Sequence, residues 1–206
     1  MNSDTAWAME ACKQAYRRLF TTLGEVDDDV VRRPSRLPDW TVGHVLTHLA
    51  RNADGHAHRL EGALRGEDVP RYPRGYDERN REIEEGAGRP AREQVADVRE
   101  SADRLTEIWR RCEAAGWPNS GFLGNDGWPT TDSPPWRLRE IEVHHVDLGL
   151  GYEATDWPEE YVRWDLPNLL ETVPERLAGP EDTRRFLAWL TGRSELPHGL
   201  RLGKWR

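Results

Sequence analysis

The segment that organises this chain reads Trp136-Arg137-Leu138-Arg139-Glu140-Ile141-Glu142-Val143-His144-His145-Val146-Asp147-Leu148-Gly149. Its apolar residues recur at the spacing of a helix, and acidic and imidazole side chains interrupt them. On a helix, Glu140 and His144 lie about 40° apart in projection and one turn apart in height. A carboxylate and an imidazole on one face can share a metal ion. The ordinary alternative is an acid–base pair on a solvated face.

A second predicted helix, residues 39–64, carries most of the other histidines. Its apolar spacing places His48 and Asn52 inward, among apolar neighbours. His56 and His58 lie among polar residues further along and are predicted at the surface. A single inward histidine is more often a satisfied core residue than a metal ligand, so His48 supports a metal site only if ligands from another helix reach it.

Helical periodicity predicts four long helices and a short fifth, with no convincing strand. The long helices are predicted at residues 5–24, 39–64, 91–115 and 136–149, and the short one at residues 76–85. This pattern is typical of a mainly α protein built as a four-helix bundle. A long crossover before the last helix suits a bundle that is not simply up-and-down.

The bundle is predicted to occupy residues 1–154. Residues 155–206 are predicted to form a small C-terminal appendage packed on the bundle, because they are too few for an independent core. Its predicted elements are helices at residues 158–176 and 183–192 and a candidate short strand within residues 196–202. Pro167 and Pro174 are expected to kink or break the first of these helices.

Composition excludes several classes of protein. Of the 206 residues, 32% are charged, and the formal net charge is −8, so the chain has no basic footprint for nucleic acid. No apolar run approaches the roughly 18 residues of a membrane span, and the first residues do not resemble an export signal. Cys12 and Cys112 are interpreted as reduced thiols. We therefore expect a cytoplasmic protein without nucleic-acid or membrane partners.

Spacing alone leaves the metal site and its register open. If the two histidine-bearing helices are neighbours, His48 can meet Glu140 and His144 in the interior. Two imidazoles and one carboxylate form the three-ligand set of a catalytic zinc site, and such a set also suits iron or nickel. Glu142 with His145 is a competing register, which lies on another face of the same helix.

Several stretches of the chain resemble the mycothiol-dependent maleylpyruvate isomerase family. Residues 37–54, LPDWTVGHVLTHLARNAD, resemble its N-terminal signature, and residues 139–149, REIEVHHVDLG, match its second signature closely. Residues 79–90 and 188–193 are similar to two further motifs, so the resemblance touches most of the chain. It implies a fold of the DinB-like class of metal-binding helical bundles.

The resemblance also implies a ligand set and a reaction. His48, Glu140 and His144 would bind a divalent metal, zinc in that family, which selects this register over Glu142 and His145. The thiol cofactor mycothiol would act as the nucleophile on a small-molecule electrophile. The implied reaction is cis–trans isomerisation of a maleylpyruvate-like compound, or transfer of the thiol sulfur to an electrophile.

Further site residues follow from the same resemblance. The family uses an arginine near the short helix to hold the substrate carboxylates, and Arg79 is assigned here, with Arg81 as the second choice. Arg51 and Asn52, which stand in the first signature, are assigned to binding of the cofactor. The segment after the bundle is shorter than in the full-length isomerase, which leaves the particular substrate open.

Two other functions stay open at this point. A hydrolase could use a metal on the same bundle without any thiol. A non-catalytic helical protein could hold a metal as a structural staple. The dependence of turnover on a low-molecular-weight thiol separates the proposed enzyme from both alternatives.

Overall fold

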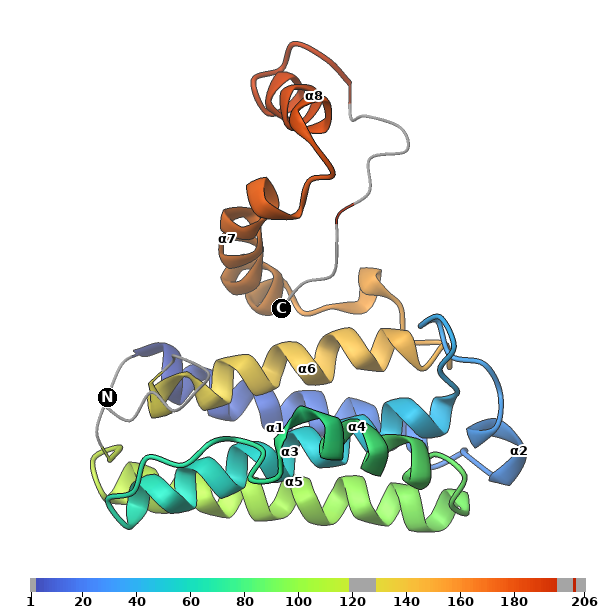
Figure 1. The fold of residues 1–206 in the computed structure, drawn as a ribbon, viewed down its shortest axis with the longest axis vertical. Helices are drawn as coiled ribbons and strands as arrows, with labels where there is room; N and C mark the ends of the chain where they lie inside the picture. The colour runs from blue at the N-terminus through green and yellow to red at the C-terminus, as the bar shows by residue number, and fades with distance from the viewer. Residues whose placement is uncertain (1–2, 119–128, 196–201, 203–206) are drawn as a thin grey trace. The chain divides into compact units, whose positions relative to one another are not determined.

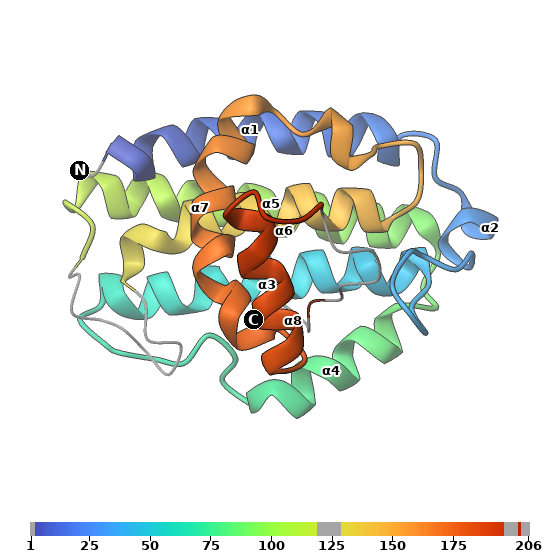
Figure 2. The same cartoon turned by 90° about the horizontal axis from the view of Figure 1, so that it is seen from above.

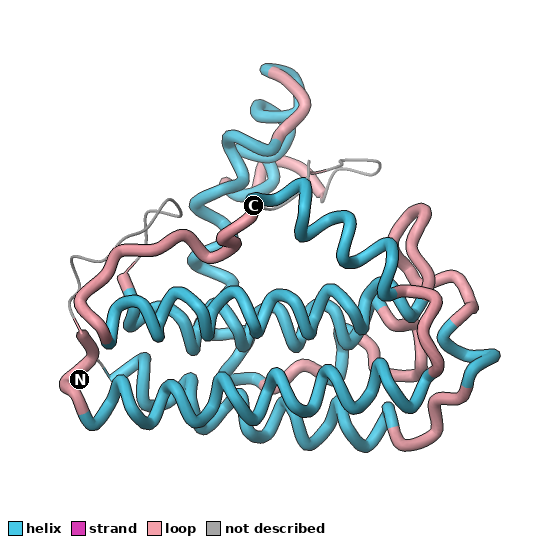
Figure 3. The backbone as a smooth tube through the Cα atoms, turned by 60° about the horizontal axis from the view of Figure 1, so that its bottom comes forward, coloured by secondary structure: helices cyan, strands magenta, loops and turns pink. Residues whose placement is uncertain are grey.

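The computed structural model describes residues 3–118, 129–195 and 202. Within this part of the chain eight α-helices form and no strand (Figure 3), which confirms the prediction of a mainly α protein. The helices are α1 (Ser3–Leu23), α2 (Asp28–Val31), α3 (Val42–Leu64), α4 (Gly75–Gly86), α5 (Ala91–Ala114), α6 (Ser133–Asp147), α7 (Glu159–Arg176) and α8 (Pro180–Leu190).

The helices α1, α3, α5 and α6 run alongside one another as a four-helix bundle (Figure 1). Contacting pairs run in opposite order along α3 and α6, His48 with Glu140 and His56 with Ser133, so these helices are antiparallel. The helices α3 and α5 run in the same direction, and α4 lies in the segment between them, against α3 (Figure 2). The predicted bundle is confirmed, but the position expected for its long crossover, before the last helix, is wrong. Residues 65–90 make the crossover between the parallel helices α3 and α5, whereas α6 runs antiparallel to both.

Apolar side chains at helical spacing hold the bundle together. Apolar residues spaced three and four apart within residues 91–115 predict a packed seam. In α5 its members Val98, Ala102, Leu105, Trp109 and Cys112 are buried, and Val95 is half-buried. Burial of each large apolar side chain contributes about 1.5–3 kcal/mol relative to exposure. The core therefore gives a firm scaffold for the polar side chains that α3 and α6 direct towards each other.

The start of α3 is set by a reciprocal cap. The Thr41 hydroxyl accepts a hydrogen bond from the His44 backbone N–H, while Nδ1 of His44 accepts one from the Thr41 backbone N–H at 3.1 Å. Such a cap satisfies two backbone donors that the first helical turn leaves open. Because the cap fixes where the helix begins, it also fixes which face carries His48. His44 itself has a structural task.

The acidic run Asp27 to Asp29 predicts an exposed connection through residue 36, but the structure forms the short helix α2 within it. Asp27 caps α2 by accepting hydrogen bonds from the backbone N–H groups of Asp29 and Val30. Val31, the last residue of α2, is buried. A helix of four residues is too short to show a repeat in the sequence, so only its cap could have indicated it.

The chain divides into two compact units, residues 1–156 and 157–206. The second unit contains α7 and α8, and α7 continues without interruption through Pro167 and Pro174. The domain boundary at residues 154/155 stays a prediction. The candidate strand within residues 196–202 lies outside the described residues except for Leu202. Across the described part of both units, no helix has the length and apolar character that crossing a membrane requires.

Candidate metal centre

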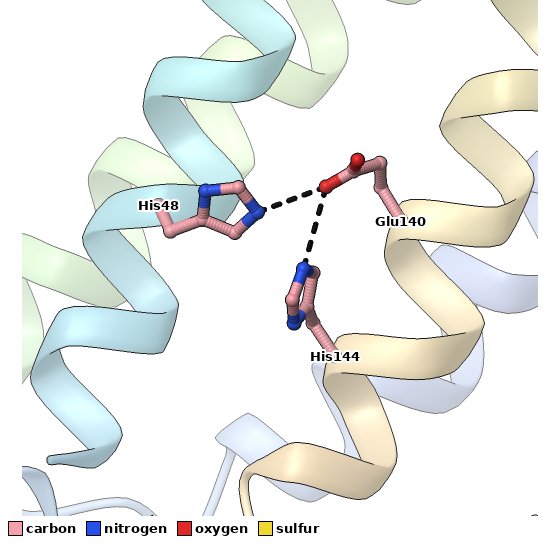
Figure 4. A group of neighbouring side chains, drawn as sticks. All are labelled: His48, Glu140 and His144. Atoms are coloured by element: carbon pink, nitrogen blue, oxygen red, sulfur yellow. Dashed lines mark hydrogen bonds and ion pairs between the residues drawn. The ribbon is translucent and has the colours of Figure 1, made fainter. Parts of the chain in front are cut away.

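Three side chains from two helices converge at the interface of α3 and α6 (Figure 4). Nε2 of His48 lies 2.8 Å from Oε2 of Glu140, and Nε2 of His144 lies 3.4 Å from the same oxygen. One ligand atom from each residue falls within 4.8 Å of the others. The two ring planes are nearly perpendicular, with their centroids 4.4 Å apart. In the sequence His48 lies 92 or more positions from Glu140 and His144, and the fold brings it to them.

Two further side chains orient the imidazoles through their Nδ1 atoms, whereas the Nε2 atoms face Glu140. Oδ2 of Asp147 lies 2.8 Å from Nδ1 of His144. The guanidinium of Arg79, on α4, donates a hydrogen bond to Nδ1 of His48. Carboxylates in the position of Asp147 commonly fix the orientation of a ligating imidazole and raise its basicity. Arg79 therefore lies beside the three-residue cluster, as the family resemblance suggests.

Burial and neighbouring charges give the two imidazoles opposite pKa shifts. Burial, together with the charge of His144, lowers the pKa of His48 to about 3. Burial also opposes a charge on His144, but hydrogen bonds to Asp147 and Glu140 outweigh it and raise its pKa to about 9. The pKa of Glu140 is lowered, since burial, which acts in the opposite direction, is exceeded by the hydrogen bonds from both histidines. At neutral pH the cluster thus holds one imidazolium, one neutral imidazole and one carboxylate.

These charges define the hydrogen bonds of the neutral imidazole. A guanidinium only donates, so Nδ1 of His48 accepts from Arg79. The proton of His48 is therefore on Nε2 and is donated to the Glu140 carboxylate. The donor set fits a divalent metal, because two nitrogens and one oxygen can each give a lone pair to one point. Such binding requires the proton on His48 to leave Nε2.

The competing register lies on another face of α6. Glu142 is buried, pairs with Arg18 of α1 at 2.5 Å, and accepts a hydrogen bond from the Tyr152 hydroxyl at 2.6 Å. His145 lies 2.8 Å from the Thr22 hydroxyl and stacks on the Tyr152 ring. Both residues join α6 to α1 and to the segment that follows α6. They do not contribute to the cluster of His48, Glu140 and His144.

The two residues assigned to the cofactor lie in different surroundings. Asn52 is buried one turn beyond His48, where its Oδ1 accepts a hydrogen bond from Arg137 at 2.7 Å. Arg51 is partly exposed and forms ion pairs at 2.7 Å with Asp54 and Asp97. Only Arg51 is accessible to a ligand in this arrangement. A role of either residue in cofactor binding stays a prediction.

Two buried polar layers continue from the cluster along the interface of α3 and α6. Arg137, fully buried, donates to Asn52 and to the Tyr16 hydroxyl. His56 lies 2.9 Å from the Ser133 hydroxyl. His56 is fully buried, so its prediction at the surface is wrong. Its spacing of four residues from Asn52 was the signal that could have placed it inward.

Neither cysteine of the chain can supply a thiolate near neutral pH. Burial raises the pKa of the Cys112 thiol to about 11, and it raises that of Cys12 further. Both residues are free thiols in the core of the bundle. A thiolate is the reactive form of a thiol, so thiol chemistry at this site requires a thiol from a small molecule.

The comparisons with known proteins identify the family and the fold. A family model described as the mycothiol maleylpyruvate isomerase N-terminal domain matches residues 12–149. The crystal structure of the mycothiol-dependent maleylpyruvate isomerase is similar, with a TM-score of 0.71 and 27% identity over 77% of this chain and 66% of that chain. A histidine-to-alanine mutant of that isomerase gives a TM-score of 0.71 and 26% identity over the same shares. The matched part of this chain thus spans just under two thirds of those structures. None of the curated proteins matches the sequence significantly.

Proposed function

Because the chain belongs to the mycothiol maleylpyruvate isomerase family, we propose that it is a metal-dependent enzyme that uses mycothiol as its nucleophile. The observation that carries the proposal is the convergence of His48, Glu140 and His144, whose ligand atoms lie within 4.8 Å of one another. The reaction is cis–trans isomerisation of a maleylpyruvate-like compound or, with another electrophile, transfer of the thiol sulfur. A reduced thiol cofactor also fits the predicted cytoplasmic location.

The three clustered residues would hold the metal. A divalent cation, zinc by preference, stabilises the thiolate form of a bound thiol and so makes it nucleophilic at neutral pH. Two neutral imidazoles and one carboxylate leave such a centre with a net positive charge, which favours an anionic sulfur. Asp147 keeps His144 oriented through Nδ1.

Arg79 would supply a positive charge for the substrate, in addition to the positive charge of the metal centre. A neutral imidazole that gives Nε2 to a cation carries its proton on Nδ1. With a metal on Nε2 of His48, Arg79 would have no acceptor on that ring and would be able to bind the substrate. A guanidinium binds a carboxylate through two parallel hydrogen bonds, which would hold the substrate and neutralise charge that develops on it.

The atoms of the proposed isomerisation balance without an oxidant or reductant. When bound at the site, the thiol would supply a nucleophile that adds reversibly to the double bond, so that the bond could rotate before the thiol leaves unchanged. His48, Glu140 and His144 would hold the metal that stabilises the thiolate, and Arg79 would neutralise the charge that moves towards the carbonyl group. If the electrophile loses a leaving group instead, the product is a thioether.

Omission of each component tests the proposed function. We expect the zinc-loaded chain to isomerise maleylpyruvate only when mycothiol is present, and we expect a chelator to abolish the activity. The measurement is the loss of maleylpyruvate absorbance with metal and thiol varied independently. Turnover of ester or amide substrates without thiol would favour the hydrolase. Bound metal with no turnover of any electrophile, mycothiol present, would favour the non-catalytic alternative.

Substitution of Arg79 separates substrate binding from metal binding. We expect Arg79→Ala to lower kcat/KM for a carboxylated electrophile by about tenfold or more, because a charge-assisted hydrogen bond to the carboxylate is lost. Zinc affinity should be unchanged or higher, because a cation next to His48 is removed. Arg81→Ala is the matched control, since Arg81 pairs with Glu78 and Glu85 on the exposed side of α4. Equal kinetics of the two variants would exclude Arg79 from the site.

A further inference from the structure

Arg79 differs from the neighbouring arginines in its partners. Arg74 and Arg81, which lie before and after it in the chain, each form ion pairs with two glutamates of α4. Within the described part of the chain, Arg79 donates hydrogen bonds to His48 and, at 2.9 Å, to Oδ1 of Asn80, and it pairs with no carboxylate. Its Nε is buried there without a hydrogen-bond partner. The charge of this guanidinium is therefore available to an anionic ligand.

The hydrogen bonds of Arg79 do not by themselves fix it at a loaded metal centre. Nδ1 of His48 accepts from Arg79 only while that nitrogen carries no proton, and with a metal on Nε2 it would carry one. Asn80 is an exposed neighbour on α4, so its contact with Arg79 does not join α4 to the bundle. A contact that does not involve His48 is needed to keep Arg79 in place.

The ring of Tyr72 provides such a contact. Tyr72 lies in the segment between α3 and α4, and the Arg79 guanidinium lies over its ring, 5.8 Å from the ring centre. Burial raises the pKa of the Tyr72 hydroxyl, so the ring is uncharged near neutral pH. An aromatic face attracts a guanidinium through its quadrupole and occupies none of the N–H donors. Unlike a carboxylate, the ring therefore holds Arg79 without neutralising its charge.

The Tyr72 ring is itself fixed against the bundle. A Cβ atom at Gly55 of α3 would lie 2.8 Å from Cε1 of Tyr72, so only glycine permits this approach of the ring to the helix. Tyr76 packs edge-on against the ring, with the two ring centres 5.0 Å apart. The Arg71 guanidinium lies 5.1 Å from the centre of the Tyr72 ring. These contacts make the ring a fixed support for Arg79 before any ligand binds.

We infer that Tyr72 is a positioning residue that holds Arg79 at the metal centre with its donors free for the carboxylate of a substrate, an inference that rests on the proposed function. Tyr72 acts through Arg79 and needs no contact with the substrate. Loss of the ring should therefore weaken the binding of a carboxylate only in a chain that still carries Arg79. This dependence separates a positioning role from a general effect on the fold.

Calorimetric titration of the full zinc-loaded chain with succinate tests the inference. Succinate has two carboxylates and no double bond, so its binding involves no addition of a thiol. We expect Tyr72→Leu to weaken succinate binding by about fivefold, and Tyr72→Phe, which keeps the ring, to bind within about twofold of the unaltered chain. Arg79→Ala should weaken binding by about tenfold. The double variant Tyr72→Leu/Arg79→Ala should bind no more weakly than Arg79→Ala alone, because the two residues act as a unit.

Two further variants complete the experiment. Tyr76→Leu is the matched control, since it removes an exposed ring that contacts Tyr72, and it should bind succinate within about twofold of the unaltered chain. Gly55→Ala leaves Tyr72 unchanged but places a methyl group against its ring, so it should reproduce the loss expected for Tyr72→Leu. If Tyr72→Leu does not fold, Gly55→Ala takes its place in the double variant with Arg79→Ala.

The outcomes separate this inference from the proposed function. Additive losses in the double variant, or a loss in Tyr72→Phe or Tyr76→Leu as large as that in Tyr72→Leu, would overturn the inference even if mycothiol-dependent turnover is observed. Failure of the unaltered chain to bind succinate would overturn it as well. Coupled losses without any thiol-dependent turnover would support the inference and count against the proposed reaction.

Discussion

We expect His48→Ala and Glu140→Ala to lose stoichiometric metal while the bundle remains folded. Zinc affinity should fall by more than about a hundredfold, since loss of a group that only supports a ligand already costs about 10- to 100-fold. Mycothiol-dependent turnover should fall in parallel by at least about a thousandfold, because the chain would lose both the binding of the thiol at the metal and the stabilisation of its thiolate form. Metal analysis of the purified variants and circular dichroism measure the two parts of this prediction.

Two controls accompany these substitutions. Glu140→Gln keeps the size and hydrogen-bonding capacity of the side chain but removes its negative charge, so it should fold normally and still bind zinc weakly. His58→Ala removes a histidine from the same helix outside the cluster and should retain one metal per chain. Full metal content in His48→Ala and Glu140→Ala would overturn the ligand assignment. Metal lost equally from His58→Ala would show that zinc binds elsewhere.

Zinc affinity should rise steeply with pH, the second large effect expected. The raised pKa of His144, about 9, means that this imidazole carries a proton at neutral pH, and the proton must leave before the nitrogen can bind metal. The lowered pKa of His48, about 3, means that His48 is already uncharged. One proton is therefore displaced per metal, and the affinity should increase about tenfold per pH unit from roughly pH 6 until it levels off near pH 9.

Competition with a zinc indicator across this pH range measures the slope. A slope of one in a plot of the logarithm of zinc affinity against pH agrees with the loss of one proton from His144. A slope near zero would mean that His144 is neutral in the metal-free protein. Asp147→Asn is the informative variant, because it removes one of the hydrogen bonds that raise the pKa of His144. In this variant the pH at which zinc affinity levels off should be lower. If that pH is unchanged, Asp147 does not hold the proton on His144.

The two residues assigned to cofactor binding, Arg51 and Asn52, differ in their exposure to solvent. Arg51 is partly exposed, while Asn52 is buried against Arg137. An amide that accepts from a buried guanidinium is costly to withdraw, since the charged donor would be left without that partner. Asn52 is therefore suited to holding α3 against α6. A contact of Arg51 with the thiol cofactor stays a prediction.

Local pattern in the sequence was sufficient for the long helices, whereas the choice of His48, Glu140 and His144 over the competing register came from the family resemblance. Periodicity is a property of neighbouring residues, so the burial of the α5 seam and the shared face of Glu140 and His144 could be predicted from spacing. The same reasoning failed for His56, because a polar residue is buried only when a partner such as Ser133 lies opposite it. It also missed α2, which has too few residues to repeat a pattern.

Tertiary structure alone decided which of the local faces meet. The antiparallel packing of α3 against α6 brings His48 to Glu140 and His144, and no spacing within either helix contains that information. The position of Arg79 beside His48 depends on how the segment with α4 folds back on α3. Helix formation is governed by contacts three and four residues apart, whereas a metal centre requires contacts across the core that only the packed bundle provides.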